Sequence, residues 1–319
     1  MASPNSTFTE MVTTTLREHP SEVADNVSNH NALYRRLKTR GKIVKLDGGY
    51  EIVRPLDYAE NSTYQRFSGY DPLNVSASDV LTSSKYSWVN AAVHITASGE
   101  EMRKNSGKNR IIPLAASRVK NAIRTASNNM SVDLYSSGAL TNQMTGLAAQ
   151  ITSDGTGTVG GINSATYSFW ANQFYELPAT PDKSTVPAGM RTMWLRCVRG
   201  TDTPDLIVST HDFFGFYWNS LTDLQRYASA DSATMGFQSL KFVTADVIFD
   251  NNSNFSTTGE TMFFLNTEYL ELCVHQDANW TQLEDKISFN QDAVVIPIIW
   301  MGNLVCSNRA RQGILVDLT

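Results

Sequence analysis

One stretch of the sequence, residues 111–138, constrains the fold more than any other. Its apolar and small residues recur at steps of three or four, which is the spacing of one buried stripe on an α-helix. The stripe consists of Ile112, Ala115, Val119, Ile123, Ala126, Met130 and Leu134. Pro113 suits the first helical turn, and Gly138 suits a C-terminal stop. We therefore predict an amphipathic helix about 37 Å long, which is either a spine for other layers or an ordinary surface helix.

Length and composition indicate a folded protein whose surface is poor in charge. The 319 residues are enough for two domains, or for one elaborated domain, with a sizeable core. Charged residues make up only 18% of the chain, whereas Asn, Ser and Thr are common, as on surfaces that meet other protein. The net charge of −5 argues against nucleic-acid binding by bulk electrostatics.

The cysteines, the N-terminus and the longest apolar run bear on where the protein works. Cys197, Cys273 and Cys306 lie in apolar contexts without metal-ligand spacing, so we expect reduced core residues of a protein made in a cytosol. The first residues lack the basic-then-apolar pattern of a secretory signal. Residues 294–305 are apolar but too few to cross a bilayer, so we expect a strand there and no membrane association.

Residues 43–97 have the pattern of a long β-extension. Two short strands are predicted around the turn sequence Asp47-Gly48-Gly49, which suits a hairpin. Residues 61–84 are a long, mostly uncharged segment with aromatic side chains, and such loops are uncommon inside compact domains. From 86 to 98 apolar and polar residues alternate with the period of a strand. Because a two-stranded extension is at best marginally stable in water, we expect it to lie on another surface.

Six basic residues in and after a short helical pattern at 32–46 have two interpretations. They are Arg35, Arg36, Lys38, Arg40, Lys42 and Lys45. Cations gather near helix C-termini, and Gly41 would stop this helix. Six charges exceed what a helix end requires, so a patch that faces a polyanion or an acidic neighbour is the alternative. The residues before the helix are polar and rich in Thr, as in an arm that becomes ordered only against a neighbour.

The second half of the chain predicts a mixed domain of helices and strands. Helices are expected at residues 189–200 and again after Asp212, which we expect to cap a helix whose apolar residues are Phe214, Tyr217, Leu221, Leu224 and Ala228. Strands are expected at residues 204–209, 240–249, 261–275 and 293–317. The Gly- and Thr-rich segment that follows Gly138 is expected to be an exposed, flexible loop.

No motif in the sequence indicates catalysis, a cofactor or a metal. The glycines at 155, 157, 160 and 161 lack the Gly-Lys-Ser/Thr ending of a phosphate-binding loop. Residues 250–261 begin like a calcium loop, but Phe255 replaces the glycine of the sharp turn and Thr261 replaces the bidentate glutamate. His211 and Asp212 would suit a hydrolase, yet no Gly-x-Ser-x-Gly sequence accompanies them. We therefore predict no enzymatic activity and no cofactor.

Six runs of sequence carry a resemblance to a known family. They are KLDGGYEIVRPLDY at 45–58, RFSGYDPLN at 66–74, SGEEMRKNSGKNRIIPL at 98–114, GTVGGINSATYSFWANQ at 157–173, and LNTEYLEL and LVCSNRARQGIL near the C-terminus. In that order they resemble the start and the tip of the extended loop, the region before the spine helix, the early axial domain and the final sheet strands of major capsid proteins of tailed bacteriophages, of the Hong Kong 97 type. The resemblance covers residues 32–318.

The resemblance implies an α+β fold of the Hong Kong 97 type in five segments. These are an N-terminal arm and short helix at 1–42, an extended β-loop at 43–97, the spine helix of a peripheral domain at 98–138, an axial domain at 139–247, and C-terminal strands at 248–319 that complete both domains. The function implied is that of a major capsid protein. Such a protein assembles as hexamers and pentamers into an icosahedral shell that encloses double-stranded DNA.

The resemblance also implies which residues meet neighbouring subunits and DNA. In the extended loop we expect inter-subunit contacts from Arg54, Asp57, Tyr58, Tyr64, Phe67, Tyr70 and Trp88. The six basic residues named above would face DNA. Some relatives are cross-linked through a lysine of the extended loop. This chain has no lysine between Lys45 and Lys85, so we expect no such bond.

Further partners and two alternative functions follow from the same resemblance. Scaffolding, portal and decoration proteins are the further partners, and the expected location is the virion, assembled in the cytoplasm of a bacterial host. Because the matched region begins near residue 32, we expect any scaffold to be a separate protein. One alternative keeps the fold and is an encapsulin-type compartment that loads protein cargo. The other is a soluble α+β hydrolase that uses His211 and Asp212.

Overall fold

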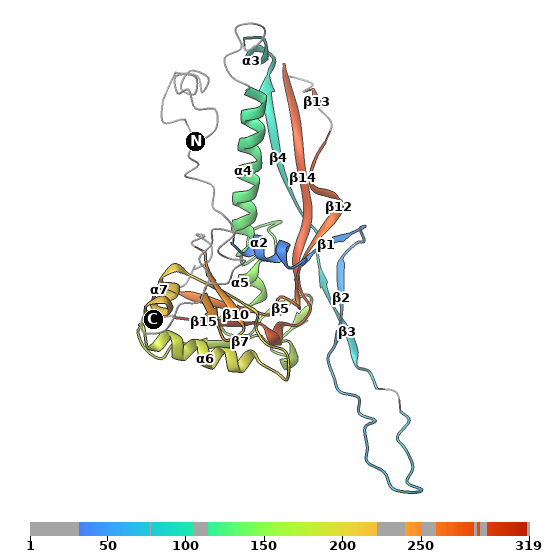
Figure 1. Ribbon diagram of the computed structural model, residues 1–319. Helices are drawn as coiled ribbons and strands as arrows, with labels where there is room; N and C mark the ends of the chain where they lie inside the picture. Colours follow the sequence, from blue (N-terminus) through green and yellow to red (C-terminus); the bar gives the residue numbers. More distant parts are fainter. Residues whose placement is uncertain are drawn as a thin grey trace.

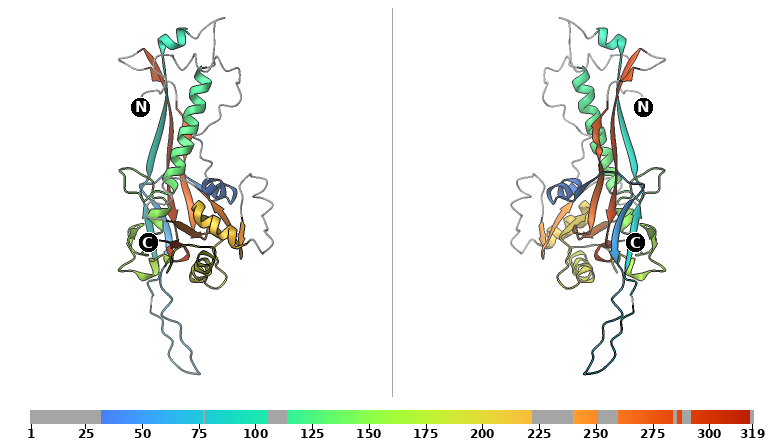
Figure 2. Two further views of the ribbon diagram at one scale, coloured as in Figure 1. Left: turned by 90° about the vertical axis from the view of Figure 1, so that its left-hand side faces the viewer. Right: turned by 90° about the vertical axis from the view of Figure 1, so that its right-hand side faces the viewer.

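The computed structural model describes residues 32–76, 78–104, 114–221, 240–250, 260–283, 286–287 and 292–317. Two larger β-sheets, a long helix and a two-stranded arm make up this part of the chain (Figure 1). One of the two is a five-stranded sheet with long strands, called here the long sheet, which runs side by side with the long helix. The six-stranded sheet lies at one end of the long sheet, and the arm extends away from both sheets. The side views of Figure 2 show the arm continuing beyond the six-stranded sheet along the direction of the long sheet.

Helix α2 (Ala32–Thr39) ends at the predicted glycine stop. Gly41 has a left-handed backbone with φ 67°, and the Lys42 N–H donates to the Leu37 carbonyl across it. Strand β1 (Ile43–Leu46) follows and pairs in parallel with β12 (Leu270–Gln282). The hairpin predicted around Asp47 is therefore wrong. Gly48 and Gly49 have positive φ, as turn residues do, but they redirect the chain from the long sheet into the arm.

The central strand of the long sheet is β14 (Ala293–Cys306), which confirms the strand predicted at 294–305. Strand β12 and the short β13 (Lys286–Ile287) pair with successive parts of it, and β4 (Val89–Ser98) pairs with its residues 293–302. The alternation predicted along β4 is present. Ile95 is buried, whereas Asn90, His94 and Thr96 are exposed. Pro297 is tolerated in β14 opposite His94 of β4.

The predicted spine helix exists as α4 (Leu114–Leu134), with the short helix α3 (Gly99–Lys104) before it. Its buried stripe consists of Ala122, Ala126, Met130 and Leu134, which pack toward the long sheet and the core. The prediction was wrong at Ile123, which is 56% exposed, because the helix presents Ala122 to β4 instead. Ile112 and Pro113 lie outside the described residues, as do the side chains of Ala115 and Val119.

A connection of short elements leads from α4 to the second sheet. Gly138, with φ 69°, turns the chain four residues after the helix ends. Helix α5 (Leu147–Gln150), the two-stranded β5 (Thr158–Val159) and β6 (Ile162–Asn163), and the 3-10 helix η2 (Ser168–Trp170) follow in order. Gly160 and Gly161 form the turn between β5 and β6, with φ of 59° and 77°. The flexible loop predicted here is therefore an ordered hairpin.

The six-stranded sheet has the order β7-β15-β11-β8-β10-β9. Its strands are β7 (Gln173–Glu176), β8 (Leu206–Ser209), β9 (Leu240–Phe242), β10 (Ala245–Phe249), β11 (Thr261–Leu265) and β15 (Gly313–Val316). Helices α6 (Thr185–Cys197) and α7 (His211–Ser220) pack on it. Helix α6, predicted at 189–200, begins and ends a few residues earlier, and its Met190, Met193 and Cys197 are buried.

Three predicted strands each prove to be two. Residues 261–275 divide into β11 and β12, residues 293–317 into β14 and β15, and residues 240–249 into β9 and β10. In the first two cases the chain leaves one sheet for the other. At the crossing, the Gln312 side chain accepts from the Asn266 N–H and donates to the Asn266 carbonyl, so these backbone groups are satisfied outside any ladder. The 3-10 helix η3 (Arg309–Arg311) makes the second crossing.

These two crossings unite the sheets in one hydrophobic core. Leu206 and Val208 of β8 belong to the same buried cluster as Leu272 of β12 and Trp300 of β14. The three cysteines are buried and free, as predicted. Burial raises the pKa of the Cys197 and Cys306 thiols to about 12.

Helix α7 begins differently from the prediction. Thr210 is its N-cap residue and makes no capping hydrogen bond with its side chain, and Asp212 lies in the first turn. The expected cap by Asp212 is therefore wrong, because the carboxylate lies 3.0 Å from His211 Nε2 on the surface instead. Phe214 and Tyr217 are buried, whereas Leu224 and Ala228 lie outside the described residues. None of the described helices is long and apolar enough to cross a membrane.

Two substitutions test which face of α4 is buried. Met130→Ala should lower the free energy of unfolding by about 2–5 kcal/mol, because it leaves a cavity in the core. Ile123→Ala should change it by about 0.5 kcal/mol or less, because that side chain is mainly in solvent. Urea unfolding of the purified chain measures both. Equal losses would place Ile123 in the buried stripe and contradict the register.

Candidate assembly interface: the extended arm

The arm consists of residues 52–86, and its paired base is a short antiparallel ladder. Strands β2 (Ile52–Asp57) and β3 (Leu81–Tyr86) pair from Ile52 opposite Tyr86 to Asp57 opposite Leu81. One further hydrogen bond joins the Tyr58 N–H to the Val80 carbonyl. The arm is thus shorter than the predicted 43–97 extension, because β1 and β4 belong to the long sheet.

The tip of the arm, residues 58–80, is shaped by polar side chains instead of a ladder. Gln65 Nε2 donates to the Pro72 carbonyl at 2.9 Å, and Gln65 Oε1 accepts from the Asn74 N–H at 3.3 Å. Asp71 Oδ2 accepts from the Ser68 N–H, which closes a turn around Gly69. The two sides of the tip are therefore held together by a few exposed hydrogen bonds.

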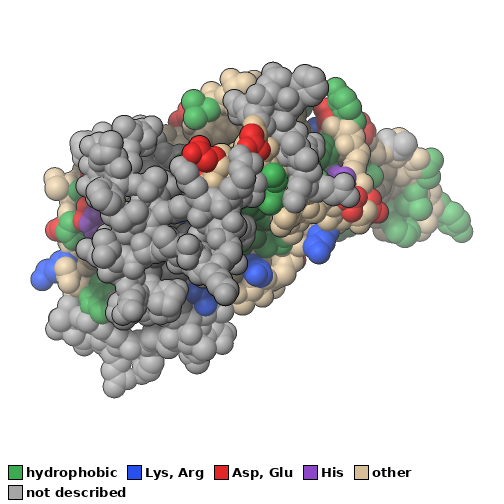
Figure 3. All heavy atoms as spheres, turned by 90° about the horizontal axis from the view of Figure 1, so that it is seen from above, with side chains coloured by type: hydrophobic (Ala, Val, Ile, Leu, Met, Phe, Trp, Pro, Cys, Tyr) green, Lys and Arg blue, Asp and Glu red, His purple; other side chains and the backbone are tan. Residues whose placement is uncertain are grey.

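Apolar side chains of the tip are exposed to a degree that is unusual for their type. Tyr64 is 82% exposed, Val75 is 91% exposed and Tyr70 is fully exposed. Phe67 and Leu73 are also more exposed than buried. Figure 3 shows hydrophobic side chains gathered on the part of the molecule that projects at the right-hand side, where Figure 1 has the arm. Clusters of this kind mark surfaces that bind another molecule.

The base of the arm, in contrast, is buried against its own chain. Ile52 and Tyr86 share a cluster with Val159 of β5 and with Cys273 and Val305 of the long sheet. Leu56 packs against Ile162 and Trp170 in a second cluster. The hairpin β5–β6 also bonds to the arm directly, since the Lys85 N–H donates to the Gly160 carbonyl at 2.9 Å.

Gly160 is the point of closest approach between this hairpin and the arm. A Cβ atom at Gly160 would lie 2.7 Å from Ser84 Cβ and 3.2 Å from the Tyr86 ring. Gly161, the next residue, has a similar positive φ and open space around it. The glycine-rich sequence thus has a packing role that its composition did not reveal.

Three of the seven residues predicted at inter-subunit contacts touch their own chain. Arg54 forms an ion pair with Glu271 at 2.6 Å and donates to Cys273 Sγ at 3.1 Å. The Tyr58 ring lies 5.6 Å from the Phe169 ring. Trp88 Nε1 donates to the Gly49 carbonyl at 2.8 Å. Each of the three is only partly exposed: Arg54 lies in the base of the arm, Tyr58 directly follows β2, and Trp88 lies two residues after β3.

The other four predicted contact residues lie in the tip of the arm or at the end of β2, just before the tip. Asp57 is exposed at the end of β2, and Tyr64, Phe67 and Tyr70 belong to the exposed tip. Leu73 and Val75 are exposed in the same tip and were not among the predicted contact residues. Tyr86, Gly160 and Trp170 were missed as well, because nothing local in the sequence indicates that such distant residues meet.

Two of the six basic residues pair with acidic residues of their own chain. Arg36 lies 3.3 Å from Asp246 Oδ2, and Arg40 pairs with Asp205 and donates to Thr267 Oγ1. These contacts join α2 and the residue after it to β10, to the residue before β8 and to the turn before β12. Arg36 and Arg40 are thus engaged inside the chain. The exposed members of the set are Arg35, Lys38 and Lys45.

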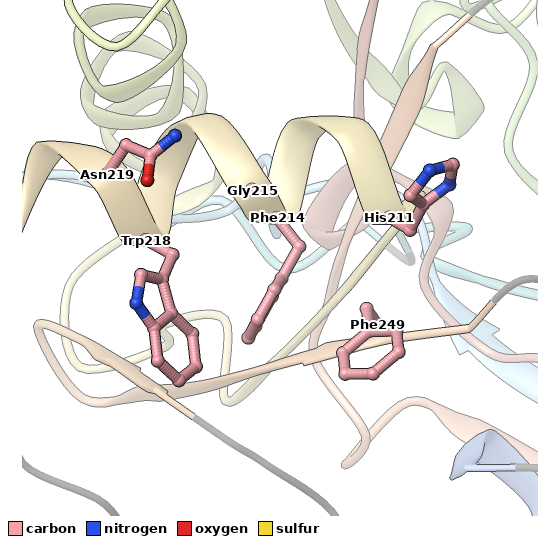
Figure 4. Close-up of a pocket in the computed structure, with 6 residues that line it drawn as sticks. All are labelled: His211, Phe214, Gly215, Trp218, Asn219 and Phe249. Carbon is pink, nitrogen blue, oxygen red and sulfur yellow. The ribbon is translucent and has the colours of Figure 1, made fainter.

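The described residues that line the pocket beside α7 do not include the nucleophile of a hydrolase. It has a volume of about 320 Å³ and is lined by His211, Phe214, Gly215, Trp218, Asn219 and Phe249. Figure 4 shows Phe214 and Trp218 of α7 directed toward the same space as Phe249 of β10, with His211 at the start of the helix. No Ser, Thr or Cys is among these residues. His211 and Asp212 are both largely exposed, unlike an oriented catalytic pair.

The described residues also contain no group of three or more side chains placed to hold a metal ion. The packed base of the arm fixes its direction, and the tip presents apolar side chains to solvent.

Comparisons with known proteins bear on the fold. No protein-family model matches the sequence, and no curated protein matches it. Solved structures match almost the whole chain. A capsid asymmetric unit of cyanophage A-1(L) superposes with a TM-score of 0.67 at 13% identity, over 98% of this chain and 100% of that one. The capsid of Myoviridae phage XM1 gives a TM-score of 0.59 at 12% identity, over 96% and 98%.

A protein compartment also superposes on the chain. The SrpI encapsulin of Synechococcus elongatus gives a TM-score of 0.60 at 7% identity, over 98% of this chain and 97% of that one. Together these likenesses show that the chain has the Hong Kong 97-type capsid fold, which confirms the predicted α+β fold class.

The contact at Gly160 generates a test of how the arm is held. Gly161→Ala should lower the free energy of unfolding by about 1–2 kcal/mol, because alanine disfavours the left-handed conformation. Gly160→Ala should lower it by about 1–3 kcal/mol more, because its methyl group also overlaps the arm. Denaturant unfolding and protease cleavage within residues 52–86 are the measurements. Equal effects of the two substitutions would show that the hairpin does not support the arm.

Proposed function

We propose that this chain is the major capsid protein of a tailed bacteriophage, which assembles as hexamers and pentamers into an icosahedral shell around double-stranded DNA. The observation that carries the proposal is the arm. Its base is buried in its own chain, and its tip presents Tyr64, Phe67 and Tyr70 to solvent. The fold shared with phage capsid structures is its second support.

A second copy of the chain is the partner that suits such an arm. In a closed shell one contact between unlike surfaces is repeated around every symmetry axis, so each arm lies on a neighbour and each subunit receives an arm. Obligate contacts of this kind bury about 2,000–5,000 Å² in total. Apolar tip side chains held out by a fixed base fit this use, because a lone molecule gains nothing from exposing them.

DNA would be held by enclosure within the wall. The net charge of −5 and the internal ion pairs of Arg36 and Arg40 leave only a small basic contribution, for which the exposed Lys38 and Lys45 are the candidates. Contacts of this type are weak, independent of sequence and sensitive to salt. The shell would work with separate scaffolding, portal and decoration proteins, and would assemble in the bacterial cytoplasm before becoming part of the virion. No catalytic step belongs to this function.

The likeness to an encapsulin supports a second candidate. In that case the same shell would enclose protein cargo in place of DNA. The arm would have the same role in both, so the two candidates differ in what the particles contain.

The arm tip provides the test of assembly. Replacing Tyr64, Phe67 and Tyr70 by Ser should give a soluble subunit with unchanged circular dichroism that no longer forms shells, because the apolar contact with the neighbour is lost. Deletion of residues 69–74 should have the same result. Size-exclusion chromatography and negative-stain microscopy are the measurements.

Arg66→Gln is the matched control for this test, because it changes an exposed side chain of the same tip without removing apolar area. It should leave the particles intact. Full-size shells from the triple variant would refute the role of the arm.

The contents of the particles separate the two candidates. Particles purified from the host that produces the complete assembly should contain double-stranded DNA that resists nuclease until the shell is disrupted. Absorbance at 260 and 280 nm, before and after disruption, measures this. Particles that contain a second protein and little nucleic acid would favour the compartment over the phage head.

A further inference from the structure

A chain of buried polar side chains leads from the base of the arm into the six-stranded sheet. It begins at Tyr86, the last residue of β3, whose hydroxyl donates to the Cys306 carbonyl at 2.9 Å and accepts from the Cys306 N–H at 3.3 Å. Gln150 Oε1, at the end of α5, lies 3.3 Å from the same hydroxyl. Gln150 Nε2 donates to the Leu304 carbonyl at 2.9 Å. The Tyr86 hydroxyl thereby bonds the arm to the end of β14, and Gln150 bonds α5 to β14 two residues earlier, beside the same hydroxyl.

The chain continues from α5 through η3 to β7. Arg309 Nε donates to the Gln150 main-chain carbonyl at 2.6 Å, and Arg309 Nη2 donates to Asn172 Oδ1 at 2.9 Å. Asn172 Nδ2 donates in turn to the carbonyls of Thr152 at 2.8 Å and Gln173 at 3.1 Å. Gln173 is the first residue of β7. We call Tyr86, Gln150, Arg309 and Asn172 the relay.

The composition of the relay is unusual for a core. All four side chains are buried, and Arg309 is completely buried. None of the described hydrogen bonds or ion pairs of Arg309 is to a carboxylate, and its Nη1 has no hydrogen-bond partner among the described residues. Burial lowers the pKa of this guanidinium. A buried charge that is bonded only to neutral groups adds little stability compared with apolar packing, but its directional bonds restrict geometry.

We propose that the relay is a positioning device, which fixes the direction of the arm relative to the six-stranded sheet. The arm cannot swing about its base without breaking the bonds of Tyr86, and the sheet cannot tilt without breaking those of Asn172. Gln150 and Arg309 lie between Tyr86 and Asn172, so a movement at either end of the relay would strain their hydrogen bonds. The consequence for particles rests on the proposed function. It assumes that the direction of the arm determines how neighbouring subunits are placed.

The substitution that tests the relay is Tyr86→Phe, which keeps the ring and removes the hydroxyl. Its matched control is Tyr217→Phe. The Tyr217 hydroxyl is also part of a buried residue and donates to one carbonyl, that of Lys241 at 2.7 Å, but it lies far from the arm in the six-stranded domain. Both changes remove one hydroxyl from a buried ring, with the loss of two hydrogen bonds to Cys306 at Tyr86 and of one at Tyr217, and they differ in their distance from the arm.

Spin labels can report the direction of the arm within one subunit. Cysteines introduced at the exposed positions Ala59 and Thr201 would carry them, while the three native thiols are buried. Labelled subunits mixed with an excess of unlabelled wild type give the intramolecular distance by pulsed electron double resonance, whether or not particles form. We expect a narrow distribution for the parent and for Tyr217→Phe, and a broadened, shifted distribution for Tyr86→Phe. Equal widths in all three would overturn the proposal.

Hydrogen exchange of the unsubstituted protein is a second test that needs no variant. If the relay joins them, the amides of β3 and β7 should open together, with matching protection. In Tyr86→Phe the exchange of the β3 amides should rise roughly fivefold, as expected for one neutral hydrogen bond. Independent opening of β3 and β7 in the unsubstituted protein would also overturn the proposal.

Particle size connects the relay to assembly. Tyr86→Phe should give particles of variable diameter, whereas Tyr217→Phe should give uniform ones. Uniform particles from both would overturn the role of the relay in assembly. If the unsubstituted protein forms no particles, the proposed function fails, and the distance and exchange measurements still decide whether the relay positions the arm.

Discussion

The constraint on which the proposed function depends is that the base of the arm is packed against its own chain whereas the tip is not. A two-stranded ribbon has too little core to hold a fixed direction in water. Here the base acquires one from two small clusters, from the ion pair of Arg54 with Glu271, and from the hairpin that contacts it at Gly160. The tip has only its own polar turns and exposes Tyr64 and Tyr70. A fixed base with an exposed apolar tip suits the proposed contact with a second copy of the chain.

The rigidity of the body that supports the arm comes from the way the final strands are shared. The chain runs from β11 in one sheet to β12 in the other, and it returns from β14 to β15. Because both crossings are made by the segment that also forms the common core, the two sheets cannot separate without exposing residues such as Leu206 and Leu272. The polar groups at the crossings, Asn266 with Gln312 and Arg309 with Gln150, replace the ladder bonds that the bends interrupt.

Two arginines of the basic run form ion pairs within the chain. The basic run in the sequence suggested a patch, but two of its arginines pair with Asp205 and Asp246, which are far away along the chain and adjacent in space. A partly buried pair of this kind loses less to solvent screening than an exposed pair, so these arginines are better explained by the attachment of α2 than by contact with DNA. The likeness of the fold to phage capsids and to an encapsulin leaves the contents of a shell to be decided by chemistry outside the fold.

The sequence by itself determined the elements whose signals are local. The helical period of α4, the alternation along β4, the glycine stop after α2 and the uncharged aromatic tip could all be predicted, because each depends on residues a few positions apart. Only the tertiary structure decided which face of α4 is buried at Ala122, that the strands predicted at 261–275 and 293–317 each change sheets, and that the glycine-rich hairpin supports the arm. Those outcomes depend on partners such as Tyr86 and Gly160, or Arg40 and Asp205, whose separation in sequence leaves no periodic trace.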